Sequence, residues 1–124
     1  MRLCLTLSML LLALSRASAQ CPGVQTTLMP FAKERLTIST TVIGLTRSIY
    51  KPTGVTPSMA IMSIEGGTVR YEVIGTPTST EGHPVLGTPA TTMTICGLPS
   101  LDGFKVLSLG TDASLFITYY KPAP

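Results

Sequence analysis

The chain has 124 residues, of which nine are Lys or Arg and six are Asp or Glu. Arg2 and Arg16 lie in a leader-like N-terminus, so the rest of the chain has a net charge near +1, which argues against a nucleic-acid partner. Charged residues make up 12% of the sequence, about half of the roughly 25% that is usual. Thr and Ser must therefore cover much of the surface.

Residues 1–19 have the pattern of a secretory signal peptide. Arg2 precedes an apolar run that ends in Leu10–Leu14, and Ala17-Ser18-Ala19 offers the small residues of a cleavage site. The run is shorter than the roughly 20 residues that cross a bilayer as a helix. We predict a cleavable signal-like helix over residues 1–19 and a single β domain over residues 20–124, a suitable length for one core.

Two of the three cysteines lie beyond the leader. Cys21 and Cys96 form an even pair in a chain predicted to be exported, which indicates a disulfide. In the chain-entropy model such a long loop adds about 4 kcal/mol to stability. Two unpaired thiols are the alternative. A lipid-anchored Cys21 is disfavoured, because Gln20 stands where a small residue should precede it.

Apolar and polar residues alternate with a period of two in the first half of the domain. This pattern predicts strands over residues 36–41 and 46–50, the second stopped by Lys51-Pro52-Thr53-Gly54. Residues 31–36 could form at most one helical turn. Residues 58–65 and 68–74 are two further strands, and Gly66-Gly67 between them predicts a hairpin turn that needs positive φ values.

The second half of the domain begins with a stretch rich in Pro and Gly. Residues 75–89 predict a long loop or a broken edge strand, because Pro cannot donate to a ladder in a central strand. Residues 91–95, 104–109 and 114–120 predict three more strands, the last two joined by a turn at Gly110-Thr111-Asp112-Ala113.

Seven to eight short strands with frequent turns favour an all-β fold, an antiparallel β-sandwich or a jelly-roll-like barrel. No segment after the leader has a sustained helical period. We expect the inward rows of the sheets to include Ile61, Ile64, Val69, Tyr71, Val73, Met93, Ile95, Phe104, Val106, Leu115 and Ile117.

The residues supply little material for catalysis. His83 is the only histidine, so a nucleophile–base arrangement would have to be built around it, and a solvated loop histidine is the simpler interpretation. Glu65 and Glu72 could face each other across the hairpin, but Arg70 nearby favours a cross-strand charge cluster. We therefore predict no catalytic, cofactor or metal site and no small-molecule substrate.

Short motifs between Ala60 and Tyr120 occur in a fixed order. They are Ile64-Glu65, Val69-Arg70-Tyr71, Gly75-Thr76-Pro77-Thr78, Gly82-His83, Phe104-Lys105-Val106, Gly110-Thr111-Asp112-Ala113-Ser114-Leu115 and Thr118-Tyr119-Tyr120. In this series, which covers about half of the chain, the sequence resembles the small β-rich structural proteins of tailed bacteriophages and prophages. The resemblance implies a virion component, such as a head decoration or head-associated subunit, without catalytic residues.

The N-terminus departs from that group, whose members normally lack an export leader and a cysteine pair. A translation start at Met29 would make residues 1–28 a misassigned extension. Two hypotheses follow. The first is a virion structural subunit whose low charge suits packing against a capsid-type lattice or its own copies. The second is an exported β-sandwich, periplasmic or extracellular, that acts in binding or adhesion.

Overall fold

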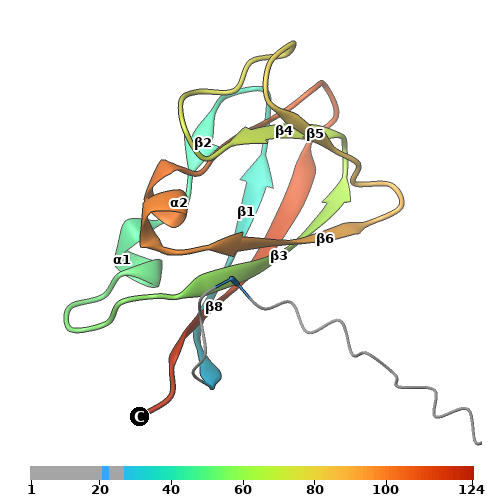
Figure 1. Ribbon diagram of the computed structural model, residues 1–124. Helices are drawn as coiled ribbons and strands as arrows, with labels where there is room; N and C mark the ends of the chain where they lie inside the picture. Colours follow the sequence, from blue (N-terminus) through green and yellow to red (C-terminus); the bar gives the residue numbers. More distant parts are fainter. Residues whose placement is uncertain (1–20, 23–26) are drawn as a thin grey trace, which may run out of the picture.

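Two antiparallel sheets of four strands each form a β-sandwich in the computed structural model, which describes residues 21–22 and 27–124 (Figure 1). Sheet A has the order β1 (Leu28–Ile38), β8 (Ala113–Pro122), β3 (Met59–Gly66) and β6 (Thr91–Cys96). Sheet B has the order β2 (Ile43–Gly44), β7 (Lys105–Ser108), β4 (Val69–Glu72) and β5 (His83–Val85). The all-β sandwich prediction is confirmed. The predicted leader lies outside the described residues.

The core lies between the two sheets and follows the period of two. Leu115, Ile117 and Tyr119 of β8 are all buried, and in the register of sheet A Met62 is paired with Ile117. Of the predicted inward residues, these are buried: Ile64, Val69, Ile95, Phe104, Val106, Leu115 and Ile117. Tyr71, Val73 and Met93 are partly buried against the core.

Ile61 was predicted to face inward, and this prediction was wrong. The buried residues of β3 are Met59, Ala60, Met62 and Ile64, whereas Ile61 lines a depression on the outer face of sheet A. Residues on one strand share a face only when they are an even number apart. Ile61 and Ile64 are three apart, so they lie on opposite faces.

Two segments differ from the predicted elements in the first half of the domain. Residues 31–36 belong to strand β1 and make no helical turn. Residues 46–50, predicted as a strand, contain the short helix α1 (Arg47–Tyr50). A helical turn brings positions three apart to one side, and Arg47 and Tyr50 both bond the carboxylate of Asp102. That shared acceptor explains why the turn is favoured over a strand.

A second helix, α2 (Leu98–Gly103), was not predicted. It begins with Pro99 in its first turn, a position where the missing N–H costs nothing, and it buries Leu101. In Figure 1 both helices lie on the same side of the sandwich, where α2 follows β6. With ten helical residues in total, this side is the only helical part of the described chain.

The loop predicted over residues 75–89 is confirmed as a loop with a broken edge strand, because only β5 is regular and it forms one edge of sheet B. Nη1 of Arg70 donates to the carbonyl of Gly82 at 2.8 Å, and Pro77 in the loop is buried. Nζ of Lys105 donates to Oγ1 of Thr76 at 3.3 Å. These contacts hold the loop against β4 and β7.

The predicted hairpin at Gly66-Gly67 was wrong. Strand β3 pairs with β6 and β8 in sheet A, whereas β4 pairs with β5 and β7 in sheet B. The two glycines therefore form a corner at which the chain crosses from one sheet to the other. The turn at Gly110 makes the return crossing, from β7 to β8. A hairpin and a corner make similar local demands on the backbone, so the glycine pair alone cannot distinguish them.

Candidate functional site

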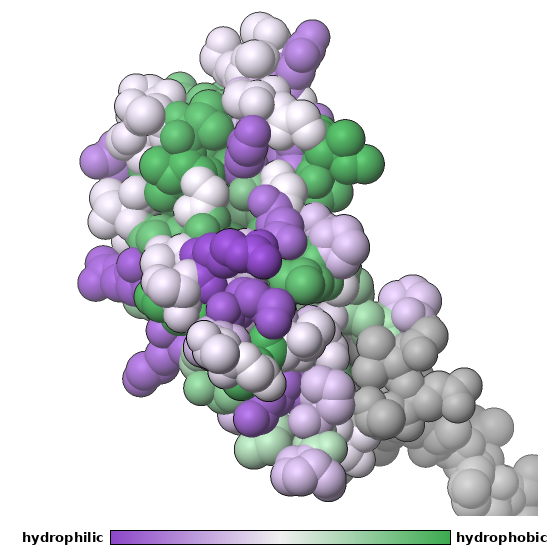
Figure 2. All heavy atoms as spheres, turned by 90° about the vertical axis from the view of Figure 1, so that its left-hand side faces the viewer, coloured by the Kyte–Doolittle hydropathy of each residue, from purple (hydrophilic) through white to green (hydrophobic). Residues whose placement is uncertain are grey.

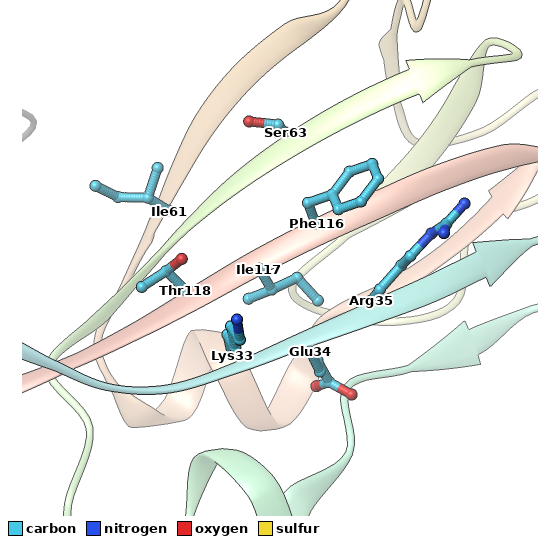
Figure 3. Close-up of a pocket in the computed structure, with 8 residues that line it drawn as sticks. All are labelled: Lys33, Glu34, Arg35, Ile61, Ser63, Phe116, Ile117 and Thr118. Atoms are coloured by element: carbon cyan, nitrogen blue, oxygen red, sulfur yellow. The ribbon is translucent and has the colours of Figure 1, made fainter.

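The outer face of sheet A carries a shallow depression of about 510 Å³ over β1, β8 and β3 (Figure 3). Eight residues line it, among them Glu34 and Ile117. We call the other six the cationic face: Lys33, Arg35, Ile61, Ser63, Phe116 and Thr118. The sheet register sets them in two rows. Arg35, Phe116 and Ser63 are neighbours in one row, and Lys33, Thr118 and Ile61 are neighbours in the next.

Arg35 is held in place on this face. Its guanidinium carbon lies 5.1 Å from the centroid of the Phe116 ring, and Nη2 donates to Oγ of Ser114 at 3.3 Å. Phe116 is 38% exposed, which is high for a large apolar side chain in a strand. A cation over an aromatic face is stabilised by about 0.5–1 kcal/mol at exposed sites. The guanidinium is thus oriented while most of its donors remain available.

The basic side chains of residues 27–124 differ in their partners. Arg47 forms an ion pair with Asp102, Lys51 and Arg70 donate to the carbonyls of Val55 and Gly82, and Lys105 and Arg35 donate to the hydroxyls of Thr76 and Ser114. Lys33, Arg35 and Lys121 form no ion pair with any described carboxylate, and residues 1–26 contain no Asp or Glu. Lys51, Arg70 and Lys105 also lack a carboxylate partner, but they lie apart from one another, whereas Lys33 and Arg35 line one depression on sheet A.

A second depression of about 280 Å³ continues the cationic face along β1 and shares Lys33 and Thr118 with the first. Phe31 lines it, and Nζ of Lys121 lies 5.9 Å from the centroid of the Phe31 ring. Each cation–aromatic pair therefore joins β1 to β8, so both ends of the face repeat the same chemistry.

Glu34 lies between Lys33 and Arg35 in sequence, but it points away from Arg35 and Phe116 (Figure 3). Its Oε1 accepts a hydrogen bond of 2.5 Å from the hydroxyl of Tyr119 and one of 3.1 Å from the backbone N–H of Thr46. Burial, followed by the hydrogen bond to Glu34, raises the pKa of Tyr119. The carboxylate is thereby kept off the cationic face.

A second tyrosine–carboxylate pair connects the two helices. The hydroxyl of Tyr50 donates to Oδ1 of Asp102 at 2.6 Å, and Arg47 forms an ion pair with the same oxygen. Burial raises the pKa of Tyr50, and the bond to Asp102 adds to the effect. Hydrophilic side chains gather at the centre of the face that carries α1 and α2 (Figure 2). The Tyr50 and Tyr119 rings lie 5.7 Å apart, so the two pairs fasten the helices to sheet A.

The two sheet crossings meet in a second open surface, which we call the uncharged corner. Its residues, none of which is charged, are Gly66, Gly67, Thr68, Leu86, Thr88, Leu109, Gly110 and Thr111. Leu86 is included because it directly precedes Gly87, whose carbonyl accepts a hydrogen bond from Gly66. All except Leu86 line a depression of about 570 Å³. Leu86 and Leu109 are 57% and 39% exposed, so this surface presents apolar side chains between Gly and Thr.

The corner is built by close approach of backbones. The N–H of Leu109 donates to the carbonyl of Thr68 at 2.9 Å, and the N–H of Gly66 donates to the carbonyl of Gly87 at 2.9 Å. Gly66 has φ +95°, as the prediction required. Gly67 is needed for another reason, because a Cβ there would lie 2.0 Å from the carbonyl oxygen of Thr111.

The predicted disulfide between Cys21 and Cys96 is present, and it closes a loop over a sequence separation of 75 residues. Cys96 ends β6, which forms one edge of sheet A, while β1 forms the opposite edge. Cys21 is buried. The bond therefore fixes the start of the described chain at the edge of sheet A that lies farther from β1.

The other residues considered for chemistry are not brought together. His83 lies beside Tyr71, with ring centroids 5.3 Å apart and the ring planes tilted by 36°, and it shares a cavity of about 250 Å³ with Ser100. No hydrogen bond joins His83 to Ser100, and no carboxylate is among the described residues that line this cavity. Glu65 and Glu72 lie in different sheets, so the predicted charge cluster across a hairpin was wrong.

No protein-family model, curated protein or solved structure matches this chain. Within residues 21–22 and 27–124, no three His, Cys, Asp or Glu side chains converge as metal ligands. No helix in the described part of the chain is both long and apolar enough to cross a bilayer. The two open surfaces are therefore the features from which a function can be argued.

Proposed function

We propose that this protein is a non-enzymatic structural subunit of the tailed-phage virion type, which packs against other protein subunits through the uncharged corner. The observation that carries this proposal is the composition of that corner, where Leu86 and Leu109 stand exposed among Gly and Thr. The cores of protein interfaces are depleted in charge, and exposed apolar side chains that gather in a patch mark contact sites.

The resemblance to phage structural proteins supports the same assignment. Two of its motifs, Ile64-Glu65 and the run that starts at Gly110, border or enter the corner. Others, among them Arg70, Gly82 and Pro77, hold the loop of residues 75–82 against sheet B. The motifs that carry the resemblance thus lie in the scaffold and at the corner.

An exported binding or adhesion module is the second candidate, and the Cys21–Cys96 disulfide favours it. Disulfides persist in oxidising compartments and are rare in the cytosol, where phage structural proteins are made. A chain starting at Met29 would keep β1 from its second residue onward but would lack this bond. The N-terminus of the natural protein therefore discriminates between the candidates.

The proposal is tested by sedimentation velocity of the purified protein together with mass spectrometry of purified virus particles. We expect the protein to associate, and Leu86→Lys to shift it to the monomer. Ile74→Lys is the matched control, because Ile74 is 85% exposed but lies beyond the opposite end of β4. A strictly monomeric protein that is absent from particles and begins at Gln20 would overturn the proposal in favour of the exported module.

A further inference from the structure

We propose that the cationic face binds a linear acidic polysaccharide, with Arg35 bonding the carboxylate of a uronate unit and Lys33 and the neighbouring hydroxyls bonding the rest of the chain. This role is separate from packing through the uncharged corner, because the two surfaces share no residue.

The charge distribution on this face calls for an anionic partner. Lys33, Arg35 and Lys121 lie along β1 and β8 without a carboxylate partner among the described residues. Glu34, the nearest acidic residue in sequence, is bonded to Tyr119 on the other side of the sheet. The rest of the domain has four basic and six acidic residues, so these cations are a local excess that complementary charge would satisfy.

Arg35 is oriented for a planar oxyanion. Its contacts with Phe116 and Ser114 fix the guanidinium before any ligand binds, which lowers the entropy lost on binding. A guanidinium fork matches a carboxylate with two parallel hydrogen bonds. Lys33 is two residues away on the same face, at a strand distance of about 7 Å, and can meet a second anionic group of a repeating polymer.

Hydroxyl groups surround the cations. Ser63 and Thr92 lie 3.4 Å apart between their hydroxyl oxygens, and Thr118 lies between Lys33 and Ile61 in the sheet. A hydroxyl both donates and accepts hydrogen bonds, as the hydroxyls of a sugar do. Short side chains also leave the face shallow, which suits a long ligand that lies across the strands.

A peptide and a second copy of the protein fit this face less well. An extended peptide gains affinity by adding to a sheet edge, where backbone groups are free. In sheet A it would add beside the edge strand β1 and would not cover β8 and β3, which pair on both sides and carry Phe116 and Ser63. If two copies of the protein met through this face, Lys33 and Arg35 of one copy would lie against Lys33 and Arg35 of the other. Like charges that face each other in an interface make its binding free energy less favourable.

Affinity measurements on the purified protein with its disulfide intact test the proposal. The probes are polygalacturonate, uncharged dextran and poly-glutamate. We expect saturable binding of polygalacturonate only, weakened about tenfold by Arg35→Gln, which corresponds to about 1.4 kcal/mol. Arg35→Lys keeps the charge but loses the fork, so an intermediate affinity is expected. Lys105→Gln removes one charge from sheet B and serves as the matched control, with an unchanged Kd.

Several results would overturn this assignment. If poly-glutamate bound as tightly as polygalacturonate, the partner would be an acidic protein segment or any polyanion. The same conclusion would follow if Lys105→Gln lost as much affinity as Arg35→Gln. Circular dichroism and thermal melting establish that each variant is folded. If Arg35→Gln does not fold, Lys33→Gln replaces it, with a loss of at least threefold expected and an unchanged Kd counting against the proposal. Leu86→Lys should bind polygalacturonate like the parent protein, so the two proposals fail independently.

Discussion

The cationic face and the uncharged corner are both open surfaces, but they are built by different means. On the face, strands that pair within sheet A project the side chains of Arg35 and Phe116, and the backbone beneath is regular. In the corner, the surface consists largely of backbone, because Gly66 and Gly67 allow the two sheet crossings to approach closely. Side chains give the face its chemistry, and the path of the chain gives the corner its shape.

This difference predicts how the two surfaces respond to substitution. A change on the face alters charge and contacts but leaves the ladder of sheet A intact. In the corner, even one methyl group added at Gly67 meets the carbonyl oxygen of Thr111, which lies between β7 and β8. We therefore expect the face to tolerate mutation with altered binding, and the corner to respond with altered stability.

Removing the disulfide is expected to have the largest effect. Replacing Cys21 and Cys96 together by Ser should lower the free energy of unfolding by about 4 kcal/mol, because a closed loop of this length restricts the unfolded chain. Urea unfolding of the parent protein, the double variant and the reduced parent protein would measure it. The double variant and the reduced protein should agree, and equal midpoints with and without the bond would contradict the prediction.

The corner is tested by Gly67→Ala. A Cβ at this position lies 2.0 Å from the Thr111 carbonyl oxygen, and we expect a loss of about 3 kcal/mol through overpacking. That loss corresponds to a fall in Tm of more than about 10 °C. Gly75→Ala is the matched control, since Gly75 has φ +85° but nothing within 4 Å of its Cβ. Backbone strain alone should cost about 1 kcal/mol there, so equal losses at both sites would refute the close approach.

The underside of the cationic face is tested by Tyr119→Phe. Loss of the hydrogen bond to Glu34 leaves a partly buried carboxylate with fewer partners and should cost about 2 kcal/mol at pH 7. Figure 3 shows why the change should not alter the face, since Glu34 points away from Arg35. Affinity for polygalacturonate should therefore be retained.

The same tyrosine predicts a dependence on alkaline pH. Its pKa in the folded protein is raised above the unfolded value of 10.0, so the unfolded chain loses this proton first as the pH rises. The stabilisation is complete below pH 10 and declines above it, by up to about 1.4 kcal/mol per pH unit. Unfolding free energies between pH 8 and 11 should fall less steeply in Tyr119→Phe. Equal slopes in the parent protein and in Tyr119→Phe would contradict the prediction.

The sequence predicts those parts of the fold that depend on local alternation. Strands β3, β4, β6, β7 and β8 were predicted because their residues keep the period of two, and the disulfide because only one pair of cysteines follows the leader. Helix α1 was missed, because its helical turn is stabilised by Asp102, which lies far along the chain.

Both open surfaces lie beyond local patterns. Arg35 and Phe116 are 81 positions apart, and only the register of β1 with β8 makes them neighbours. Neither residue was predicted to face inward. That expected outward position was the one signal in the sequence that pointed to the cationic face. The corner was hidden because Gly66-Gly67 satisfies a hairpin and a sheet crossing equally, and the choice depends on which strands pair.

The smallest expected effect concerns the interior behind the corner. Ser108 is fully buried on β7, where it pairs with Val69, and its hydroxyl has no hydrogen-bond partner among the described residues. A buried hydroxyl without a partner costs free energy, so Ser108→Ala should raise the stability by up to about 1 kcal/mol. Ser63→Ala on the cationic face is the control, because that hydroxyl has Thr92 nearby, and it should not stabilise. A destabilised Ser108→Ala would show instead that the corner needs a polar group, such as a site for a bound water, behind its two crossings.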